Sequence, residues 1–185
     1  MIRKALFLDR DGVINIDTGY VHRIRDFKFV EGIFELTRFA IDKGYMIFVV
    51  TNQAGIGRGY YTESDFHAVT HWMLDCFKSE GVAIKKVFFS PYHPVHGIGK
   101  YKQNHLSRKP YPGMFLQAEN EFDLDLNSSV LIGDKASDIK AGLAAGVGTN
   151  LYLSNDLYVN NSGLDNYYHI TNIDEAKEYF QEQIA

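Results

Sequence analysis

Short continuous apolar runs alternate along the chain with segments whose apolar residues recur every three or four positions. The continuous runs predict strands near residues 5–8, 45–50, 84–89, 129–132 and 148–153. The spaced pattern predicts helices over residues 31–43, 62–80, 114–122, 136–145 and 173–183. This alternation is typical of an α/β fold. We therefore expect a doubly wound, Rossmann-like parallel sheet of about five strands with helices on both faces.

Residues at the ends of the predicted helices agree with these assignments. Thr62 and Asp65 have the spacing of a capping box in front of the second helix. Gly44 and Gly146 directly follow helical patterns, at the position where glycine commonly ends a helix. The pattern assigns no element to residues 154–170.

The length of the chain, 185 residues, predicts a single domain that spans residues 1–185. Hydrophobic residues make up 45% of the sequence, which is ample for a core. One loop and one helix separate the first two predicted strands, and residues 55–107 are accounted for by one helix, one strand and one loop. We therefore expect no large cap domain.

Charge and the N-terminal sequence restrict the partners and the compartment. The formal net charge of −4 argues against nucleic acid as a default partner. The first apolar run has only about five residues, too few for a signal-peptide core or a membrane span. Cys76 is the only cysteine and cannot form an internal disulfide. We expect a cytoplasmic protein without membrane contacts, and a monomer.

Two carboxylates follow the first predicted strand directly. Asp9 and Asp11 are two residues apart, so in an extended chain both side chains point the same way, and Gly12 permits a sharp exit from the strand. Ligands of open α/β sheets bind beyond the carboxyl ends of the strands. Taken alone, the segment could equally be a polar turn. If both carboxylates face one site, they need a cation between them.

Later strand ends add the other parts of a phosphoryl-transfer site. The second strand ends in Thr51-Asn52-Gln53 and a glycine-rich segment, which can hold an anion through side chains and backbone N–H groups. Arg108 and Lys109 precede a helix, and the fourth strand leads to Asp134 and Asp138. Mg²⁺ binds oxygen ligands and substrate phosphate. Asp9, Asp134 and a backbone carbonyl near Asp11 could hold it, so the predicted metal residues are Asp9, Asp11 and Asp134.

In order and spacing, these segments resemble the four motifs of the haloacid dehalogenase (HAD) superfamily of phosphatases. The resemblance covers residues 5 to 140 and is closest to the heptose bisphosphate phosphatases and their histidinol-phosphate phosphatase relatives. It implies a Mg²⁺-dependent phosphomonoesterase that forms an aspartyl phosphate and acts on a sugar bisphosphate, or alternatively on histidinol phosphate. The implied roles are nucleophile for Asp9, acid/base for Asp11, phosphate binding for Thr51, Asn52, Gln53 and Lys109, and substrate contacts for Arg108 and Lys135.

Substrate selection is expected in two loops, residues 16–30 and 90–107, because phosphatases of this superfamily without a cap close their sites with loops. Tyr20 lies in the first loop, and Arg58 follows the glycine-rich segment. Arg58, Arg108 and Lys135 provide more positive charge than one phosphoryl group needs. This excess suggests a substrate with a second phosphate. Asp138 could bind the metal, cap a helix or hold Lys109.

One feature departs from the family that the sequence resembles. Many heptose bisphosphate phosphatases hold the loop before the Arg-Lys-Pro motif with zinc, bound by a Cys-x-His and a Cys-x-Cys pair. The corresponding residues here are Ser90, Tyr92, His105 and Ser107. Structural zinc needs four nitrogen or sulfur ligands. No cysteine is within reach, and His93 or His96 could not complete the set, so we expect no structural zinc.

Two other classes of protein fit less well. A phospho-receiver domain also binds Mg²⁺ and forms an aspartyl phosphate, but its acidic pair is adjacent on the first strand and its phosphorylated aspartate lies on a later strand. Here the Asp-x-Asp segment comes first. A phosphatase acting on nucleic-acid ends would need a basic groove, which the acidic composition does not favour.

Overall fold

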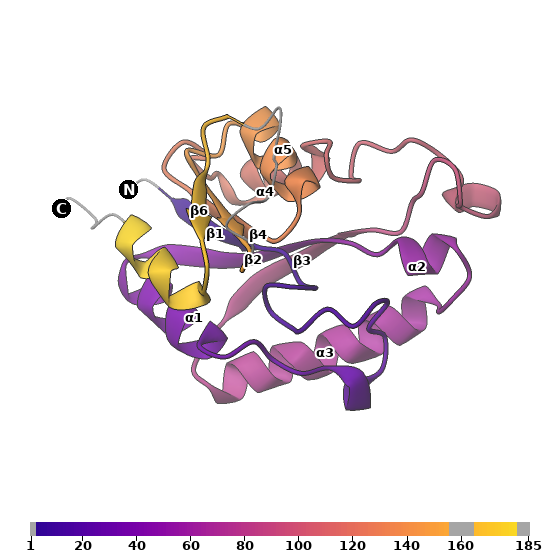
Figure 1. The fold of residues 1–185 in the computed structure, drawn as a ribbon, viewed down its shortest axis with the longest axis horizontal. Helices are drawn as coiled ribbons and strands as arrows, with labels where there is room; N and C mark the ends of the chain where they lie inside the picture. Colours follow the sequence, from indigo (N-terminus) through magenta and orange to yellow (C-terminus); the bar gives the residue numbers. More distant parts are fainter. Residues whose placement is uncertain (1–2, 156–164, 181–185) are drawn as a thin grey trace.

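A computed structural model describes residues 3–155 and 165–180. Six parallel strands form one sheet in the order β3-β2-β1-β4-β5-β6 (Figure 1). Their bounds are β1 Lys4–Leu8, β2 Tyr45–Asn52, β3 Ile84–Ser90, β4 Val130–Gly133, β5 Thr149–Leu153 and β6 Tyr168–Ile170. The doubly wound parallel sheet predicted from the sequence is confirmed, and residues 3–155 and 165–180 form no large cap domain.

Helices cover both faces of this sheet. The α-helices are α1 Ile33–Asp42, α2 Ala54–Gly57, α3 Glu63–Ser79, α4 Gly113–Phe122 and α5 Ala136–Ala145. Three 3₁₀ helices are η1 Ile24–Asp26, η2 Gly99–Tyr101 and η3 Ile173–Tyr179. In Figure 1, α1 and α3 lie below the sheet and α4 and α5 above it. No helix in the described residues is both long and apolar enough to cross a membrane.

The central strand β1 is buried on both faces. Leu6 and Leu8 join the core under α1 and α3, whereas Ala5 and Phe7 join the core under α4 and α5. Alternate side chains of a strand point to opposite faces, so a strand covered on both sides must be apolar throughout. This requirement explains the continuous apolar run. It also places Asp9, the first polar residue after the apolar run, at the strand's carboxyl end.

The predicted helix boundaries are largely confirmed. Thr62 and Asp65 form the capping box of α3, in which the Thr62 hydroxyl accepts from the Asp65 amide at 3.1 Å and the Asp65 carboxylate accepts from the Thr62 amide at 2.8 Å. Gly44 and Gly146 follow α1 and α5 with φ of 82° and 86°. These are left-handed conformations that glycine adopts without strain.

Three elements differ from the prediction. The sheet has a sixth strand, β6, which falls in the segment without an assigned element; residues 156–164 of that segment lie outside the described structure. The C-terminal helix is the 3₁₀ helix η3 and ends at Tyr179, and residues 181–185 also lie outside the description. The glycine-rich segment after β2 contains the one-turn helix α2.

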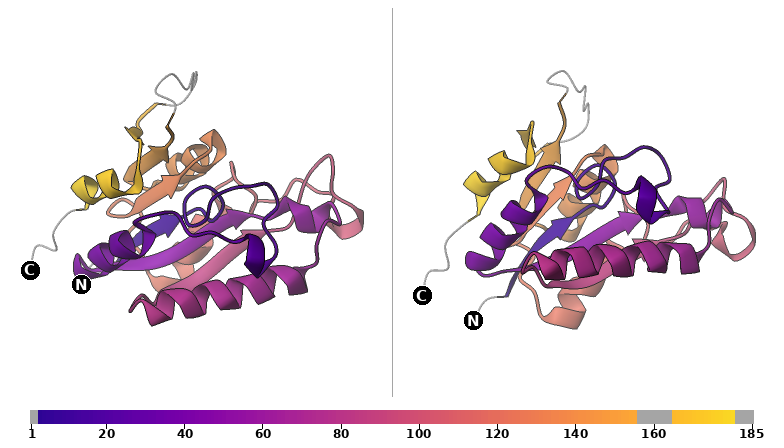
Figure 2. Two further views of the ribbon diagram at one scale, coloured as in Figure 1. Left: turned by 60° about the horizontal axis from the view of Figure 1, so that its bottom comes forward. Right: turned by 90° about the horizontal axis from the view of Figure 1, so that it is seen from below.

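The segment between β1 and α1 lies on the same side of the sheet as α1 and α3 (Figure 2). Its Val13, Ile14, Val21 and Phe27 are buried in the core that those helices cover. The segment therefore packs against the protein along part of its length. Its polar residues Asp17 and Tyr20 reach the carboxyl ends of the strands, where the functional residues gather.

Candidate active site

Asp9 lies at the carboxyl end of the central strand and is only 4% exposed. Its amide donates to the carbonyl of Ile132 at 3.0 Å, which extends the pairing of β1 with β4 by one residue. Its Oδ1 accepts from the Arg10 amide at 2.8 Å and from the Lys109 ammonium at 2.9 Å. Two donors on one oxygen fix the orientation of the carboxylate.

The buried ammonium of Lys109 uses all three of its N–H groups. It contacts Asp9 Oδ1 at 2.9 Å, Asp138 Oδ1 at 2.7 Å and the Val50 carbonyl at 2.7 Å. Burial by itself would lower the pKa of Lys109, but the two carboxylates raise it above its ordinary value. Lys109 is therefore charged, and it links the ends of β1, β2 and α5.

Asn52 fixes the backbone of Lys109. Its Oδ1 accepts from the Lys109 amide at 3.0 Å, and its Nδ2 donates to the Lys109 carbonyl at 3.0 Å. This reciprocal pair resembles one rung of a sheet ladder. The amide predicted to bind phosphate thus also positions the lysine that contacts Asp9.

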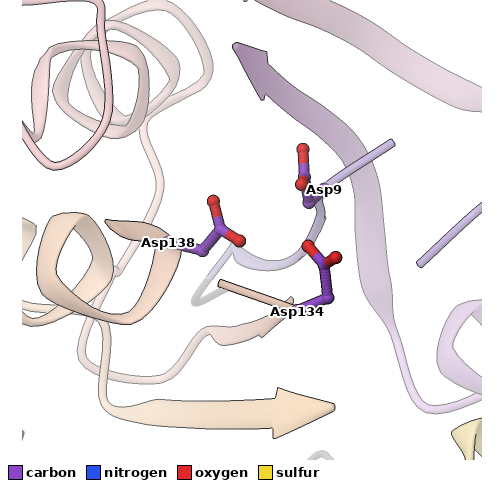
Figure 3. Close-up of side chains that lie close together, drawn as sticks. All are labelled: Asp9, Asp134 and Asp138. Atoms are coloured by element: carbon purple, nitrogen blue, oxygen red, sulfur yellow. The ribbon is translucent and has the colours of Figure 1, made fainter. Parts of the chain in front are cut away.

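Three carboxylates converge at this strand edge, as Figure 3 shows for Asp9, Asp134 and Asp138. One oxygen from each lies within 4.8 Å of the others. Burial and the Asp9 carboxylate raise the pKa of Asp134 to about 8. Asp134 Oδ1 is also buried and has no hydrogen-bond partner in the described structure. A hard divalent cation would satisfy this oxygen and offset the negative charge, so the three residues fit Mg²⁺.

Asp11 faces away from this cluster toward a separate set of donors. Its carboxylate accepts from Arg10 Nη2 at 2.8 and 3.0 Å, from Asn15 Nδ2 at 3.1 Å and from Gln53 Nε2 at 3.0 Å. Arg10 is 1% exposed and also donates to the Val21 carbonyl at 2.6 Å. The carboxylate is therefore held at the cavity wall, apart from the three that converge.

A hydrogen-bonded chain supports Asp11 from behind. The Tyr61 hydroxyl donates to Gln53 Oε1 at 2.6 Å, and Gln53 Nε2 donates both to Asp11 and to the Thr51 hydroxyl, the latter at 2.9 Å. Burial raises the pKa of Tyr61, which keeps its phenol protonated as the donor. Thr51 is buried and supports Gln53.

Sequence reasoning did not identify Arg10, Asn15 or Tyr61 as site residues. Arg10 lies between Asp9 and Asp11 in the Asp-Arg-Asp-Gly segment. This position of a cation between two carboxylates can be read from the sequence and could have indicated that Arg10 belongs to the site. Nothing in the local sequence around Asn15 or Tyr61 indicates that they reach this site.

A cavity of about 380 Å³ opens over Asp9, Asp11 and Lys109. Most of the residues predicted from the sequence line it, namely Tyr20, Asn52, Gln53, Arg58, Arg108, Lys135 and Asp138. Asp138 both holds Lys109 and caps α5, accepting from the Lys135 amide at 3.0 Å. The Lys135 ammonium pairs with Asp17 at 3.0 Å, which ties the 16–30 loop to α5.

The four residues at the positions of the family's zinc ligands contact one another. Ser107 Oγ lies 3.0 Å from Ser90 Oγ and 2.7 Å from His105 Nδ1. The rings of His105 and Tyr92 stack with their centroids 4.1 Å apart. This cluster joins the two ends of the 90–107 loop through hydrogen bonds and ring stacking.

Comparisons with known proteins agree with this geometry. A family model described as HAD-hydrolase-like matches residues 106–158. The D-glycero-α-D-manno-heptose-1,7-bisphosphate 7-phosphatase of Burkholderia mallei is 58% identical over 153 residues, which cover 83% of this chain and 81% of that protein. The chain belongs to the heptose bisphosphate phosphatase family of HAD-like hydrolases. It is an enzyme, a phosphatase.

Further members of the heptose bisphosphate phosphatase family match over similar lengths. The enzyme of Vibrio cholerae, named for the β anomer, is 49% identical and the match covers 82% of this chain and 81% of that protein. The enzyme of Campylobacter jejuni, named for the α anomer, is 47% identical, with 84% of this chain and 86% of that protein covered.

Solved structures of HAD phosphatases share the fold. The crystal structure of a HAD-like phosphatase from Mesorhizobium loti is 32% identical, with a TM-score of 0.84 and coverage of 100% of this chain and 90% of that one. The D,D-heptose 1,7-bisphosphate phosphatase from B. bronchiseptica, complexed with magnesium and phosphate, has a TM-score of 0.81 at 23% identity, with 95% and 97% covered. The arrangement of strands and helices is thus that of this family.

Proposed function

We propose that this phosphatase removes the 7-phosphate from D-glycero-D-manno-heptose 1,7-bisphosphate. The observation that carries the proposal is the 58% identity with the B. mallei enzyme, which is named for this reaction. The site supports it, because the buried Asp9 carboxylate and the Lys109 ammonium line one cavity, and Asp134 converges with Asp9 and Asp138 at its edge. Both the α and the β anomer are candidates, since the relatives are named for different anomers.

In this proposal Asp9 attacks the phosphorus of the 7-phosphate. An oxygen of its carboxylate bonds to phosphorus while the bond from phosphorus to the sugar oxygen breaks. Asp11 gives a proton to the departing sugar oxygen. Lys109 is already charged and fixed, so it can balance the negative charge on the phosphoryl group without rearranging.

The second half of the reaction restores the free Asp9 carboxylate and the protonated Asp11. Asp11 takes a proton from water, the water oxygen bonds to phosphorus, and the bond between phosphorus and Asp9 breaks. Inorganic phosphate leaves and Asp9 is free again. General acid and base catalysis of this kind contributes about 10²–10⁴-fold to the rate. The chain from Tyr61 through Gln53 holds Asp11 in position for both proton transfers.

Mg²⁺ is the proposed cofactor, and Asp9, Asp134 and the backbone near Asp11 would hold it, with the Asp138 carboxylate close beside them. When bound, it screens the repulsion between the Asp9 carboxylate and the anionic phosphate. The orphaned Asp134 Oδ1 and the raised pKa of Asp134 support the assignment. So does the bound magnesium of the B. bronchiseptica enzyme. We propose no structural zinc.

A substrate panel tests the proposal. It consists of the α and β anomers of heptose 1,7-bisphosphate, heptose 7-phosphate and histidinol phosphate, each assayed by phosphate release. We expect one anomer of the bisphosphate to have the highest kcat/KM, by about tenfold or more over heptose 7-phosphate. ³¹P NMR of the product should show that the 1-phosphate remains. Faster hydrolysis of histidinol phosphate would contradict the substrate assignment.

A further inference from the structure

Arg10 is a buried cation that contacts both Asp11 and the loop of residues 16–30. Its side chain is 1% exposed, and its Nη2 lies 2.8 and 3.0 Å from the two carboxylate oxygens of Asp11. The same nitrogen donates to the Val21 carbonyl at 2.6 Å. One guanidinium therefore joins the proposed acid/base carboxylate to the backbone of the loop.

The surroundings of Arg10 fix its guanidinium in place. Its Cζ lies 5.9 Å from the ring centroid of Phe27 and 5.8 Å from that of Phe66 in α3, and both rings are buried. Its Nη1 is buried too and has no hydrogen-bond partner among the described residues, which costs free energy. A buried cation with an unsatisfied donor is a poor stabilising element, so its place beside Asp11 indicates a role in the reaction.

A second path connects the same loop to Asp11 through Tyr61. The rings of His22 and Tyr61 are stacked, with their centroids 4.9 Å apart and their planes 2° from parallel. The Tyr61 hydroxyl donates to Gln53, and the Gln53 amide donates to Asp11. Val21 and His22 are neighbours in the loop, so two consecutive residues reach one carboxylate by different paths.

The conformation of the loop at these residues is fixed as well. His22 Nδ1 donates to the Tyr20 carbonyl at 2.7 Å, because a carbonyl oxygen can only accept. Tyr20 has a φ of 53°, a left-handed conformation that is costly for a bulky residue. A Cβ on Gly55 would lie 2.2 Å from Tyr61 Cε1 and 2.9 Å from Tyr20 Cδ1, so both rings pack on its backbone. Tyr20 also lines the cavity, directly beside the two residues that connect to Asp11.

We propose that residues 20–22 position the Asp11 carboxylate against the leaving group, with Arg10 and Tyr61 as the positioning residues that connect them. This inference rests on the proposed function, in which Asp11 gives a proton to the departing sugar oxygen. A sugar that contacts Tyr20 would hold the loop, Arg10 and Asp11 in one geometry. Proton transfer requires a donor within hydrogen-bonding distance, so the loop contributes to bond cleavage as well as to substrate binding.

Two aryl phosphates that differ in their leaving group test the inference. Phenolate is a far stronger base than p-nitrophenolate, so cleavage of phenyl phosphate depends more strongly on a proton donor. We define the leaving-group ratio as kcat/KM for p-nitrophenyl phosphate divided by kcat/KM for phenyl phosphate, both measured with the full-length enzyme and Mg²⁺. Because kcat/KM covers the steps up to loss of the leaving group, a misplaced acid raises this ratio. General structural damage lowers both values alike.

Variants of the two paths should raise the leaving-group ratio. Arg10→Met keeps a long side chain but removes its N–H groups, and we expect a rise of about tenfold, part of the effect of a general acid. His22→Ala removes the stacking on Tyr61 and should raise the ratio about fivefold, whereas His22→Phe restores a ring and should return it toward the wild-type value. Arg38→Met, at a surface ion pair of α1, and His71→Ala, at an exposed residue of α3, are matched controls that should keep the wild-type ratio.

The Asp11→Asn background shows whether these residues act through Asp11. Asp11→Asn alone should raise the leaving-group ratio. Addition of Arg10→Met or His22→Ala should then produce no further rise, because the proton donor is already lost. Circular dichroism confirms that each variant is folded. If Arg10→Met does not fold, the His22 variants decide by the same criterion.

An unchanged leaving-group ratio in folded Arg10→Met or in His22→Ala would overturn the inference, and so would an equal rise in the Asp11→Asn background. Failure of the proposed function has different signatures. An unchanged ratio in Asp11→Asn would refute the acid/base role itself, and the inference with it. If heptose 1,7-bisphosphate is not hydrolysed preferentially but the ratio responds to Arg10 and His22, the positioning role stands and only the identity of the sugar is wrong.

Discussion

Asp9 is the residue whose loss should affect turnover most. Asp9→Asn keeps the shape of the side chain but removes its negative charge, so it can neither attack phosphorus nor bind Mg²⁺ as well. We expect kcat to fall below about 1% of the wild-type value. Asp42→Asn, at an exposed aspartate at the end of α1, is the matched control and should retain full activity. An Asp9→Asn enzyme with more than a few per cent of wild-type kcat would refute the nucleophile assignment.

Asp11→Asn should slow both halves of the reaction, because the amide cannot give or take the proton. The expected loss in kcat is about 10²–10⁴-fold. Rapid acid quench with ³²P-labelled substrate measures phosphate bound covalently to the protein. Accumulation of such phospho-enzyme would show that the loss of Asp11 blocks the second half more than the first, whereas kcat near the wild-type value would exclude the acid/base role.

Gly12 is the residue that leaves room for Asp134. A Cβ on Gly12 would lie 2.1 Å from Asp134 Oδ2, and its φ is +96°. Gly12→Ala should therefore displace Asp134 and raise the Mg²⁺ concentration for half-maximal activity by about 10–100-fold. Gly19 has a similar φ of +85° but no atom within 4 Å of its Cβ position.

Gly19→Ala is thus a matched control, with the backbone strain of about 1–2 kcal/mol but without the clash. We expect its Mg²⁺ dependence to stay unchanged while its thermal midpoint falls. Equal Mg²⁺ dependence of the Gly12 and Gly19 variants would show that the position of the Asp134 side chain does not depend on the absence of a Cβ at Gly12.

Among the elements, the 90–107 loop is the one whose sequence departs from the pattern of the heptose bisphosphate phosphatase family. Hydrogen bonds between Ser90, Ser107 and His105, and the stacking of Tyr92 on His105, join its ends. Two serines and a tyrosine are poor zinc ligands, so we expect less than about 0.2 zinc per chain in protein purified without a histidine tag. Atomic emission analysis after dialysis measures it. Stoichiometric zinc that resists chelation would contradict the expectation.

Elements with a strong periodic pattern were predictable, and the site followed from them. The continuous run before Asp9 is apolar because β1 is buried on both faces, and parallel strands bring their carboxyl ends to one edge. For that reason the sequence alone could predict that Asp9, Lys109 and Asp134 lie at one site. The strand β6 was not predictable, because three residues make no recognisable pattern and only pairing with β5 makes them a strand.

Contacts that depend on the paths of the loops could not be predicted from the sequence either. Tyr61 reaches Gln53 only because the chain turns after α2, where the Tyr60 amide donates to the Gly55 carbonyl. His93 reaches the cavity only because the 90–107 loop packs on Gly57. In the sequence, the three histidines of that loop are equivalent. The hydrogen bonds to the amides of Val95 and His96 are what distinguish His93, and they depend on tertiary structure.

For the whole molecule, we expect activity to require Mg²⁺ while the fold does not. Lys109 pairs with Asp9 and Asp138 without any metal, so loss of Mg²⁺ leaves these two buried carboxylates with a positively charged partner. Removing Mg²⁺ that was present at a hundredfold excess over its Kd costs about 2.7 kcal/mol. This should lower the Tm by about 5–10 °C with a single cooperative transition.

The assay compares hydrolysis before and after EDTA treatment and dialysis, with Mg²⁺ added back as the control. Full activity after exhaustive chelation would remove the metal from the mechanism. Loss of the cooperative transition would show that the metal is part of the folded core.

The oligomeric state of the molecule stays a prediction from the sequence. We expect a monomer. Size-exclusion chromatography with light scattering should give a mass near 21.1 kDa. A stable dimer with unchanged activity would contradict this expectation but leave the site assignment intact.

Two residues at the end of β2, Asn52 and Gln53, hold the 90–107 loop at both ends. The Gln53 amide donates to the Ser90 carbonyl at 2.7 Å where the loop begins, and Asn52 pairs with the backbone of Lys109 just beyond its end. A loop anchored in this way can change in length and sequence without moving the lysine. Natural selection can therefore alter which sugar the enzyme accepts while the hydrolytic machinery is inherited intact, so substrate range and catalysis can evolve separately on this scaffold.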